Sequence, residues 1–261
     1  MQHAMGLGIG IMIYALLRRR SVPVWAAVLA CLPPLFDLSF LRLEHSVLSD
    51  TMLIFLVVAA TTVYLWRPVP SARTAVATGL LLALAGLTRT AAVALLGVFL
   101  LHLLVRRAGW RPVLALGLTV ALPLAAYAAW YHQHHGRFAL SGSDGVALWA
   151  RTMTFADCDV IKPPADEARL CPNGTVVDAA SEYVWAPDAS INQLGGDRTA
   201  YNGLARSFAV RAILAQPLDY LADVAHDVSL AFRWTPVRHP DRTPPWVSFP
   251  VGTGHCRNST R

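Results

Sequence analysis

The chain has 261 residues, of which 55% are hydrophobic and only 15% are charged. This composition excludes an ordinary soluble domain and favours a protein with several membrane-spanning segments. The net charge of +6 does not indicate nucleic-acid binding, because residues 1–131 contain 10 Arg against 3 acidic residues, whereas residues 132–261 contain 12 Lys and Arg against 13 acidic residues. An excess of Arg confined to the apolar half is typical of cytoplasmic loops in membrane proteins.

Apolar segments follow one another through the first half of the chain. A helix needs about 20 residues to cross a hydrocarbon layer roughly 30 Å thick. The segments that approach this length are 4–17, 22–36, 51–66, 74–88, 91–105 and 112–131. The sequence therefore predicts an all-α fold: a transmembrane helical bundle over 1–131, with about six spanning or half-spanning segments.

The breaks between these segments alternate in charge. Residues 18–20, 67–73 and 106–111 hold eight Arg and no acidic residue, which predicts that they face the cytoplasm. The 37–50 loop, the break around Arg89 and the region after Tyr131 then face outward. We expect a multi-pass protein of the plasma membrane. No basic leader precedes the first apolar segment, so we expect the sequence to start within a membrane-spanning segment.

Residues 132–261 form a second region, which we expect to be mainly helical and extracytoplasmic. Its Cys158 and Cys171 lie in a Pro-rich segment. Outside the cytoplasm such a pair favours a disulfide over a metal site.

The segment from Pro217 to Trp234 has the pattern of an amphipathic helix. Apolar residues recur every three or four positions, at Leu218, Leu221, Ala225, Val228 and Phe232, while Asp219, Asp223 and Asp227 occupy another face. Burial of the apolar face against the core of the second region is the arrangement that this pattern predicts; the membrane surface is the alternative.

Four polar residues gather where the outward loop meets the third apolar segment: Arg42, Glu44, His45 and Asp50. Charges near the hydrocarbon are costly and often mark functional sites. Glu44 and His45 are also candidate ligands of a divalent metal ion, and Asp50 is a candidate cap for the following helix. The alternative is that these are solvated loop charges.

Arg89 interrupts an apolar run near the outer face. Its guanidinium carries forked donors that suit a lipid phosphate or pyrophosphate. The alternative is that Arg89 extends to the membrane interface without binding a ligand.

Two motifs carry a resemblance to a known family. The runs "LRLEHSVLSDTMLIFLVVAATTVYLWRP" and "ATGLLLALAGLTRTAAVALLGVFLLHLL" resemble the polyprenyl-phosphate-sugar-dependent glycosyltransferases of the GT-C superfamily, which include protein O-mannosyltransferases and lipid A aminoarabinose transferases. The region after residue 140 resembles the extracytoplasmic segments of actinobacterial members. The resemblance implies transfer of a sugar from a polyprenyl-phosphate donor to an acceptor protein, glycan or lipid, with Glu44 and Asp50 as catalytic residues and Arg42, His45 and Arg89 as substrate-binding residues.

The chain departs from the family pattern at one place. Family members carry an acidic residue in the first outer loop, and no residue here matches it. We therefore expect an internal portion of such an enzyme, and a second hypothesis is a non-catalytic membrane-anchored interaction protein with a disulfide-bonded outer domain. A transporter is a weaker third hypothesis, because no pair of interrupted helices recurs in corresponding halves.

Overall fold

The computed structural model describes residues 2–45, 49–174, 180–230 and 232, without the side chains of Ser39, Arg42, Ser181 and Glu182. Helices make up all of the regular structure in these residues, so the expectation of an all-α fold is confirmed for them. The chain divides into two compact units, Met1–Ser141 and Gly142–Arg261. This division falls ten residues after the boundary expected from the sequence.

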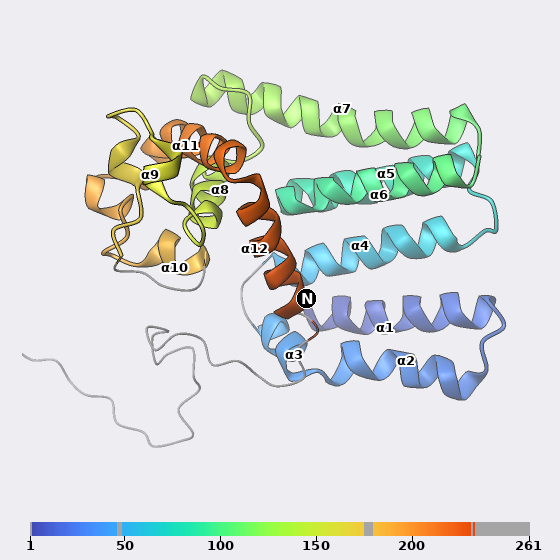
Figure 1. The fold of residues 1–261 in the computed structure, drawn as a ribbon. Coiled ribbons are helices and arrows are strands. Elements are labelled where there is room, and N and C mark those ends of the chain that lie inside the picture. Colours follow the sequence, from blue (N-terminus) through green and yellow to red (C-terminus); the bar gives the residue numbers. More distant parts are fainter. Residues whose placement is uncertain (1, 46–48, 175–179, 231, 233–261) are drawn as a thin grey trace, which may run out of the picture. The chain divides into compact units, whose positions relative to one another are not determined.

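Unit 1 is built from long helices joined by short turns. Its elements are α1 (Gln2–Arg19), α2 (Val24–Phe36), α3 (Leu38–His45), α4 (Asp50–Leu65), α5 (Ala72–Thr88), the 3-10 turn η1 (Thr90–Ala92), α6 (Val93–Val105) and α7 (Trp110–His135). Figure 1 shows the long helices of this unit running side by side, with α3 as a short piece across one end. Successive long helices therefore alternate in direction.

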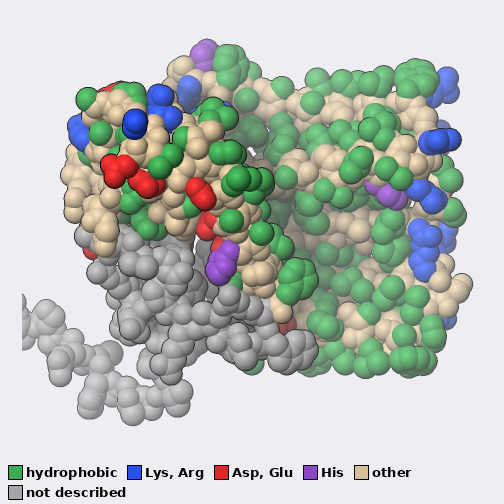
Figure 2. Space-filling view, viewed as in Figure 1, with side chains coloured by type: hydrophobic (Ala, Val, Ile, Leu, Met, Phe, Trp, Pro, Cys, Tyr) green, Lys and Arg blue, Asp and Glu red, His purple; other side chains and the backbone are tan. Residues whose placement is uncertain are grey.

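One end of this bundle is basic. Arginines of the turns gather there, as Figure 2 shows, while apolar side chains cover the flank of the bundle. Several of them bind the carbonyl oxygens left free where α4 ends: Arg19 donates to Trp66 O at 2.7 Å and Arg20 donates to Leu65 O. Cations near a helix C-terminus stabilise its exposed carbonyls. The arrangement explains why the arginines cluster at these breaks.

Small residues let the helices of unit 1 approach closely. A Cβ atom on Gly79 of α5 would lie 2.9 Å from the Cβ of Thr119 on α7, and 3.2 Å from the carbonyl oxygen of Leu116. Close contact through small residues is typical of helices packed within a membrane. Large apolar side chains meanwhile point away from the core, including Leu118, which is 55% exposed. A helix that is apolar on its outer side is suited to a lipid environment.

Most of the predicted spanning segments form helices that are shorter than a membrane-spanning helix needs to be. Of the described helices, α7 is long and apolar enough to cross a membrane. The apolar helices α2, α4 and α5, and the stretch Thr90–Val105, are shorter. The six spanning or half-spanning segments therefore remain a prediction, although their bounds agree with the helices to within a few residues.

The outward loop expected at 37–50 is largely a helix. Asp37 supplies the reason, because its carboxylate accepts a hydrogen bond of 2.9 Å from the N–H of Phe40 and its carbonyl accepts from Leu41 N. An Asp that binds the first free N–H groups of a helix is an N-cap. The polar residues Glu44 and His45 are thus carried by α3 rather than by a loop.

Unit 2 is a small helical domain with its own core. Its elements are α8 (Asp144–Thr152), α9 (Cys158–Ile161), η2 (Ala168–Leu170), α10 (Ala180–Trp185), η3 (Asn192–Leu194), η4 (Arg198–Tyr201), α11 (Asn202–Ala215) and α12 (Pro217–Leu230). Trp149 of α8 and Phe208 of α11 are fully buried at its centre. Asn202 fixes these two helices together, because its side-chain oxygen accepts from the N–H groups of Gly145 and Val146 at the start of α8.

A disulfide joins Cys158 and Cys171, so this prediction is confirmed. The bond links α9 to the end of η2, on the edge of the core around Leu170. Of the cysteines in the described residues, Cys31 is free and buried. Cys256 lies outside the described residues.

The amphipathic helix α12 is present, but its orientation differs from the prediction. None of its described residues is buried, and Leu218 and Leu221 on the apolar face are exposed. Asp223 and Asp227, on the polar face, contact Arg151 of α8 instead. The expectation of an ordinary core helix was therefore wrong.

Candidate functional site

Most of the predicted polar residues lie at the end of unit 1 opposite the arginine-rich turns. Glu44 and His45 end α3, Asp50 begins α4, and Arg89 follows α5 directly. Arg89 has an extended backbone (φ −146°, ψ 126°) and interrupts the helical path before η1. Because α4 and α5 run in opposite directions, the first turn of α4 and the last turn of α5 meet at this end.

The structure brings Arg89 and Asp50 into direct contact. Nη2 of Arg89 donates to Oδ2 of Asp50 at 2.9 Å, and Nε lies 3.5 Å from the hydroxyl of Ser49. The Arg89 side chain is 48% exposed and that of Asp50 is 21% exposed. A guanidinium has five donors, so Arg89 retains N–H groups for a ligand while Asp50 fixes its position.

Glu44 forms a second pair, with a residue that the sequence analysis did not select. Nδ1 of His3 lies 2.6 Å from Oε2 of Glu44, whose residue is only 8% exposed. Gly6 makes room for this carboxylate, since a Cβ atom there would lie 1.8 Å from Oε1 of Glu44. The only signal in the sequence is a polar His at the start of an apolar segment, which by itself does not identify a partner 41 residues away.

His45 and Arg42 have different environments. Nδ1 of His45 lies 2.8 Å from the carbonyl oxygen of Leu41, and its ring packs edge-on against that of His3 with centroids 4.7 Å apart. Arg42 lies on α3, and its side chain is outside the described part of the structure. Its predicted role in binding substrate therefore remains a prediction.

Thr51 adds a polar group that the sequence did not suggest. It follows Asp50 on α4 and is fully buried, and its hydroxyl has no hydrogen-bond partner among the described residues. Buried hydroxyls in folded proteins are nearly always paired with protein, water or ligand. This orphaned group lies next to the Arg89–Asp50 pair in the sequence of α4.

A metal centre is not assembled by the described side chains. No group of three or more His, Cys, Asp or Glu residues among them has the geometry to hold an ion. Glu44 and His45 are consecutive on α3, so their side chains leave the helix about 100° apart, and Glu44 already contacts His3. Binding of a divalent ion by Glu44 and His45 therefore stays a prediction.

The site thus consists of the Arg89–Asp50 ion pair and the His3–Glu44 contact. A comparison of the chain with protein-family models, curated proteins and solved structures finds no match.

Proposed function

We propose that this chain belongs to a membrane glycosyltransferase that moves a sugar from a polyprenyl-phosphate donor to an extracytoplasmic acceptor. The main support is the contact between Arg89 and Asp50, which joins the two motifs that resemble the GT-C superfamily although they lie 39 residues apart. It occurs at the end of the bundle opposite the arginine-rich turns. By the positive-inside rule this is the outer end.

In this proposal the Arg89–Asp50 pair and the His3–Glu44 pair have different roles in the transfer reaction. Transfer breaks the bond between the sugar carbon and a phosphate oxygen, so negative charge develops on the phosphate. Arg89, held by Asp50, stabilises that charge with its remaining N–H groups. Asp50 is then a positioning residue. Glu44 accepts the proton of the attacking acceptor hydroxyl, and His3 orients its carboxylate.

The proposal includes a multi-pass arrangement in the plasma membrane. Helices of 16 residues such as α4 are about 24 Å long, shorter than a hydrocarbon layer of about 30 Å. Polar residues at their outer ends, as at Asp50 and Arg89, suit an active site set into the outer leaflet. Unit 2 follows α7 and is accordingly extracytoplasmic, which agrees with its disulfide.

A transfer assay tests the proposal. Membranes carrying the full-length gene product are supplied with polyprenyl-phosphate sugars, with and without a chelator. Arg89→Ala and Glu44→Ala should each lower transfer by roughly 10²–10³-fold, the usual loss for one preorganised electrostatic group. The control is Arg111→Ala, which removes an exposed Arg at the other end of the bundle. Equal transfer by all variants would refute the assignment. A loss of transfer with chelator would support the predicted divalent metal ion.

One observation favours the alternative of a non-catalytic anchored interaction protein. Glu44, Asp50 and Arg89 are each paired within the chain, and paired charges can serve folding alone. On this hypothesis the same substitutions lower stability and no sugar donor supports transfer. Measuring folding and transfer on the same preparations separates the two.

A further inference from the structure

Helix α12 presents its apolar side to the outside of unit 2. Leu218 is 77% exposed, Leu221 59%, Val228 56%, and Phe232, just beyond the helix, 82%. Their spacing of three, seven and four places them on one side of a helix. We call this set, together with Ala225, the α12 stripe. Exposed apolar patches of this kind mark protein or membrane contacts.

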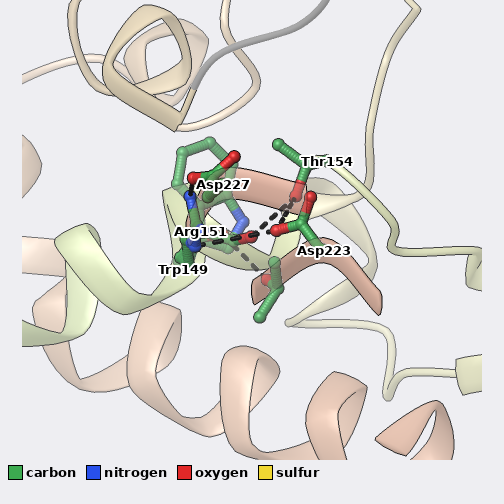
Figure 3. A network of polar contacts seen from close by, with 6 residues as sticks. Trp149, Arg151, Thr154, Asp223 and Asp227 are labelled. Atoms are coloured by element: carbon green, nitrogen blue, oxygen red, sulfur yellow. Dashed lines mark hydrogen bonds and ion pairs between the residues drawn. The ribbon is translucent and has the colours of Figure 1, made fainter. Parts of the chain in front are cut away.

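The opposite side of α12 is bound to α8, the first helix of unit 2, by ion pairs. Arg151 of α8 forms ion pairs with Asp227 and with Asp223, the latter at 3.6 Å. The hydroxyl of Thr154 also donates to Asp223 at 3.0 Å. Figure 3 shows Arg151 with both carboxylates and Thr154 beside Asp223. An amphipathic helix usually buries its apolar side, so α12 is attached in the reverse sense.

The start of the helix is fixed as well. Gln216, which is buried between α11 and α12, accepts from the N–H of Asp157 and donates to Asp219, both at 2.9 Å. Leu214, the last large residue of α11, is exposed next to this corner. These two hydrogen bonds fix the corner between α11 and α12, and with it the orientation of the α12 stripe.

The tether of unit 2 indicates what covers this surface. Only eight residues separate the end of α7 at His135 from the start of α8 at Asp144, a link that spans at most about 30 Å. Among the helices that the structure describes, α7 is the one long and apolar enough to cross a membrane. Unit 2 thus starts close to a bilayer surface, which is present at much higher local concentration than a second copy or another protein.

We propose that the α12 stripe lies in the outer membrane interface, with its Leu, Val and Phe side chains among the lipids. The stripe contains no charged residue, and Asp223 and Asp227 are turned towards Arg151. Interfacial helices that bind by charge carry Lys and Arg on their polar face, and α12 has none. Docking therefore depends on apolar burial and is insensitive to anionic lipid and to salt. This inference rests on the membrane placement in the proposed function and not on glycosyl transfer.

Labels placed along the helix test the orientation. In a Cys31→Ser, Cys256→Ser background, an environment-sensitive fluorophore is attached to the full chain in phosphatidylcholine nanodiscs, through Leu221→Cys or Val228→Cys. The matched control is His226→Cys, on the same helix and exposed but outside the stripe. Spin-labelled lipid should quench the stripe labels several-fold more than the control, with the same result when anionic lipid is added.

The possible results are distinct. Equal quenching of stripe and control overturns the proposal, and so does a stripe label that is shielded from aqueous iodide without being quenched by lipid, because a protein surface then covers it. A fourth label at Leu118→Cys, on the outer side of α7, reports the bundle itself. Quenching at Leu118 without quenching at the stripe refutes only the docking of α12, whereas no quenching at Leu118 refutes the membrane placement.

A second inference rests on a separate cavity, at the basic end of unit 1. It has a volume of about 210 Å³ and lies between α1, α4 and α6. The residues with polar or charged side chains that line it are Arg20, Tyr64, Arg67, His102 and Arg106. None of the residues found to line it is acidic.

The donors of this cavity are only partly used. Arg20 and Arg106 each give one N–H to a backbone carbonyl, of Leu65 and Pro68. The buried hydroxyl of Tyr64 lies 2.7 Å from Nδ1 of His102, a contact that leaves the other ring nitrogen outside the pair. We infer that this cavity binds a phosphate group, that of an anionic phospholipid, because forked guanidinium donors match phosphate oxygens and basic pockets between helices bind such head groups.

Thermal unfolding in nanodiscs tests this site, again through the membrane placement and not through transfer. Replacing phosphatidylcholine partly by phosphatidylglycerol should raise the melting temperature of the wild type and of Arg111→Gln, a control Arg at the same end that does not line the cavity. Arg20→Gln with Arg106→Gln should lose the rise. A rise with inorganic phosphate alone identifies free phosphate as the source of the group. No rise in the wild type, or an equal rise in the double variant, overturns the inference.

Discussion

Exchanging the charges of Arg89 and Asp50 separates a structural role of this pair from a role in transfer. The side chains are partly exposed, at 48% and 21%. Exposed ion pairs contribute about 0.2–1 kcal/mol, so the double variant Arg89→Asp, Asp50→Arg should lose less stability than the sum of the two single variants, each of which places like charges together. The reversed charges at the two helix ends keep the double variant below the wild type. Transfer should stay roughly 10²–10³-fold low, because the guanidinium no longer projects from the break after α5.

The assay measures thermal unfolding in nanodiscs and sugar transfer on the same four proteins. Recovery of stability without transfer is the expected result. Recovery of both would refute our reasoning, since it would show that the pair serves folding and that no ligand needs the cation at position 89. A loss of stability in the double variant equal to the sum of the two single losses would instead show that the two side chains do not pair.

Three further predictions concern other parts of the chain. Replacing both cysteines of the unit 2 disulfide by Ala should lower the free energy of unfolding by about 3 kcal/mol, the value expected for a loop of this size, measured by pulse proteolysis; no change would mean that the unfolded loop is already compact. Gly6→Ala should displace the Glu44 carboxylate and lower transfer while the protein stays folded, whereas Gly117→Ala should have no effect because nothing lies within 4 Å of its added Cβ. Hydrogen bonds from the backbone N–H and hydroxyl of Thr199 lower the pKa of Asp197. The stabilisation of η4 should therefore be present above the unfolded pKa of about 3.9 and be lost as the pH falls through the lower folded value. Amide protection factors near η4, which are corrected for the intrinsic pH dependence of exchange, should fall in acid for the wild type and stay constant in Asp197→Asn.

Apolar patterning predicted the helices of unit 1 because their length and spacing are local properties of the sequence. The predicted segment 74–88 corresponds to α5, Ala72–Thr88, whose start is set by the Ser71 side chain accepting from Thr74 N. The alternation of basic breaks also placed Asp50 and Arg89 at the same end of the bundle. It did not predict that they touch, since pairing depends on how α4 and α5 are packed.

The errors have a common physical origin in distant partners. The apolar face of α12 was expected in the core, but Asp223 and Asp227 are bound by Arg151, more than 70 residues earlier in the chain. His3, at the start of α1, was missed because its partner Glu44 lies on α3, 41 residues later in the chain. In each case a polar side chain contacts a partner far away in the sequence, which no local pattern predicts. The contact determines which side of the helix faces the rest of the protein.

The position of each site charge relative to a helix terminus shows whether that charge stabilises the fold. Asp50 in the first turn of α4 and Arg89 at the end of α5 both have the sign that stabilises a helix terminus, so folding alone accounts for their positions. Glu44 does not fit this pattern, because it is an acid in the last turn of α3 and is buried. An acid in such a place costs roughly 0.3–1 kcal/mol through the dipole.

We therefore expect Glu44→Gln to leave the melting temperature unchanged or to raise it. The amide oxygen still accepts from His3, and the unfavourable charge is gone. Transfer should nevertheless fall by roughly 10²–10³-fold, because a neutral amide cannot accept the proton of the acceptor. Residues that lower stability and are needed for activity are typical of active sites. Strong destabilisation by this substitution would show that Glu44 serves the fold, and the proposed transfer chemistry would lose its base.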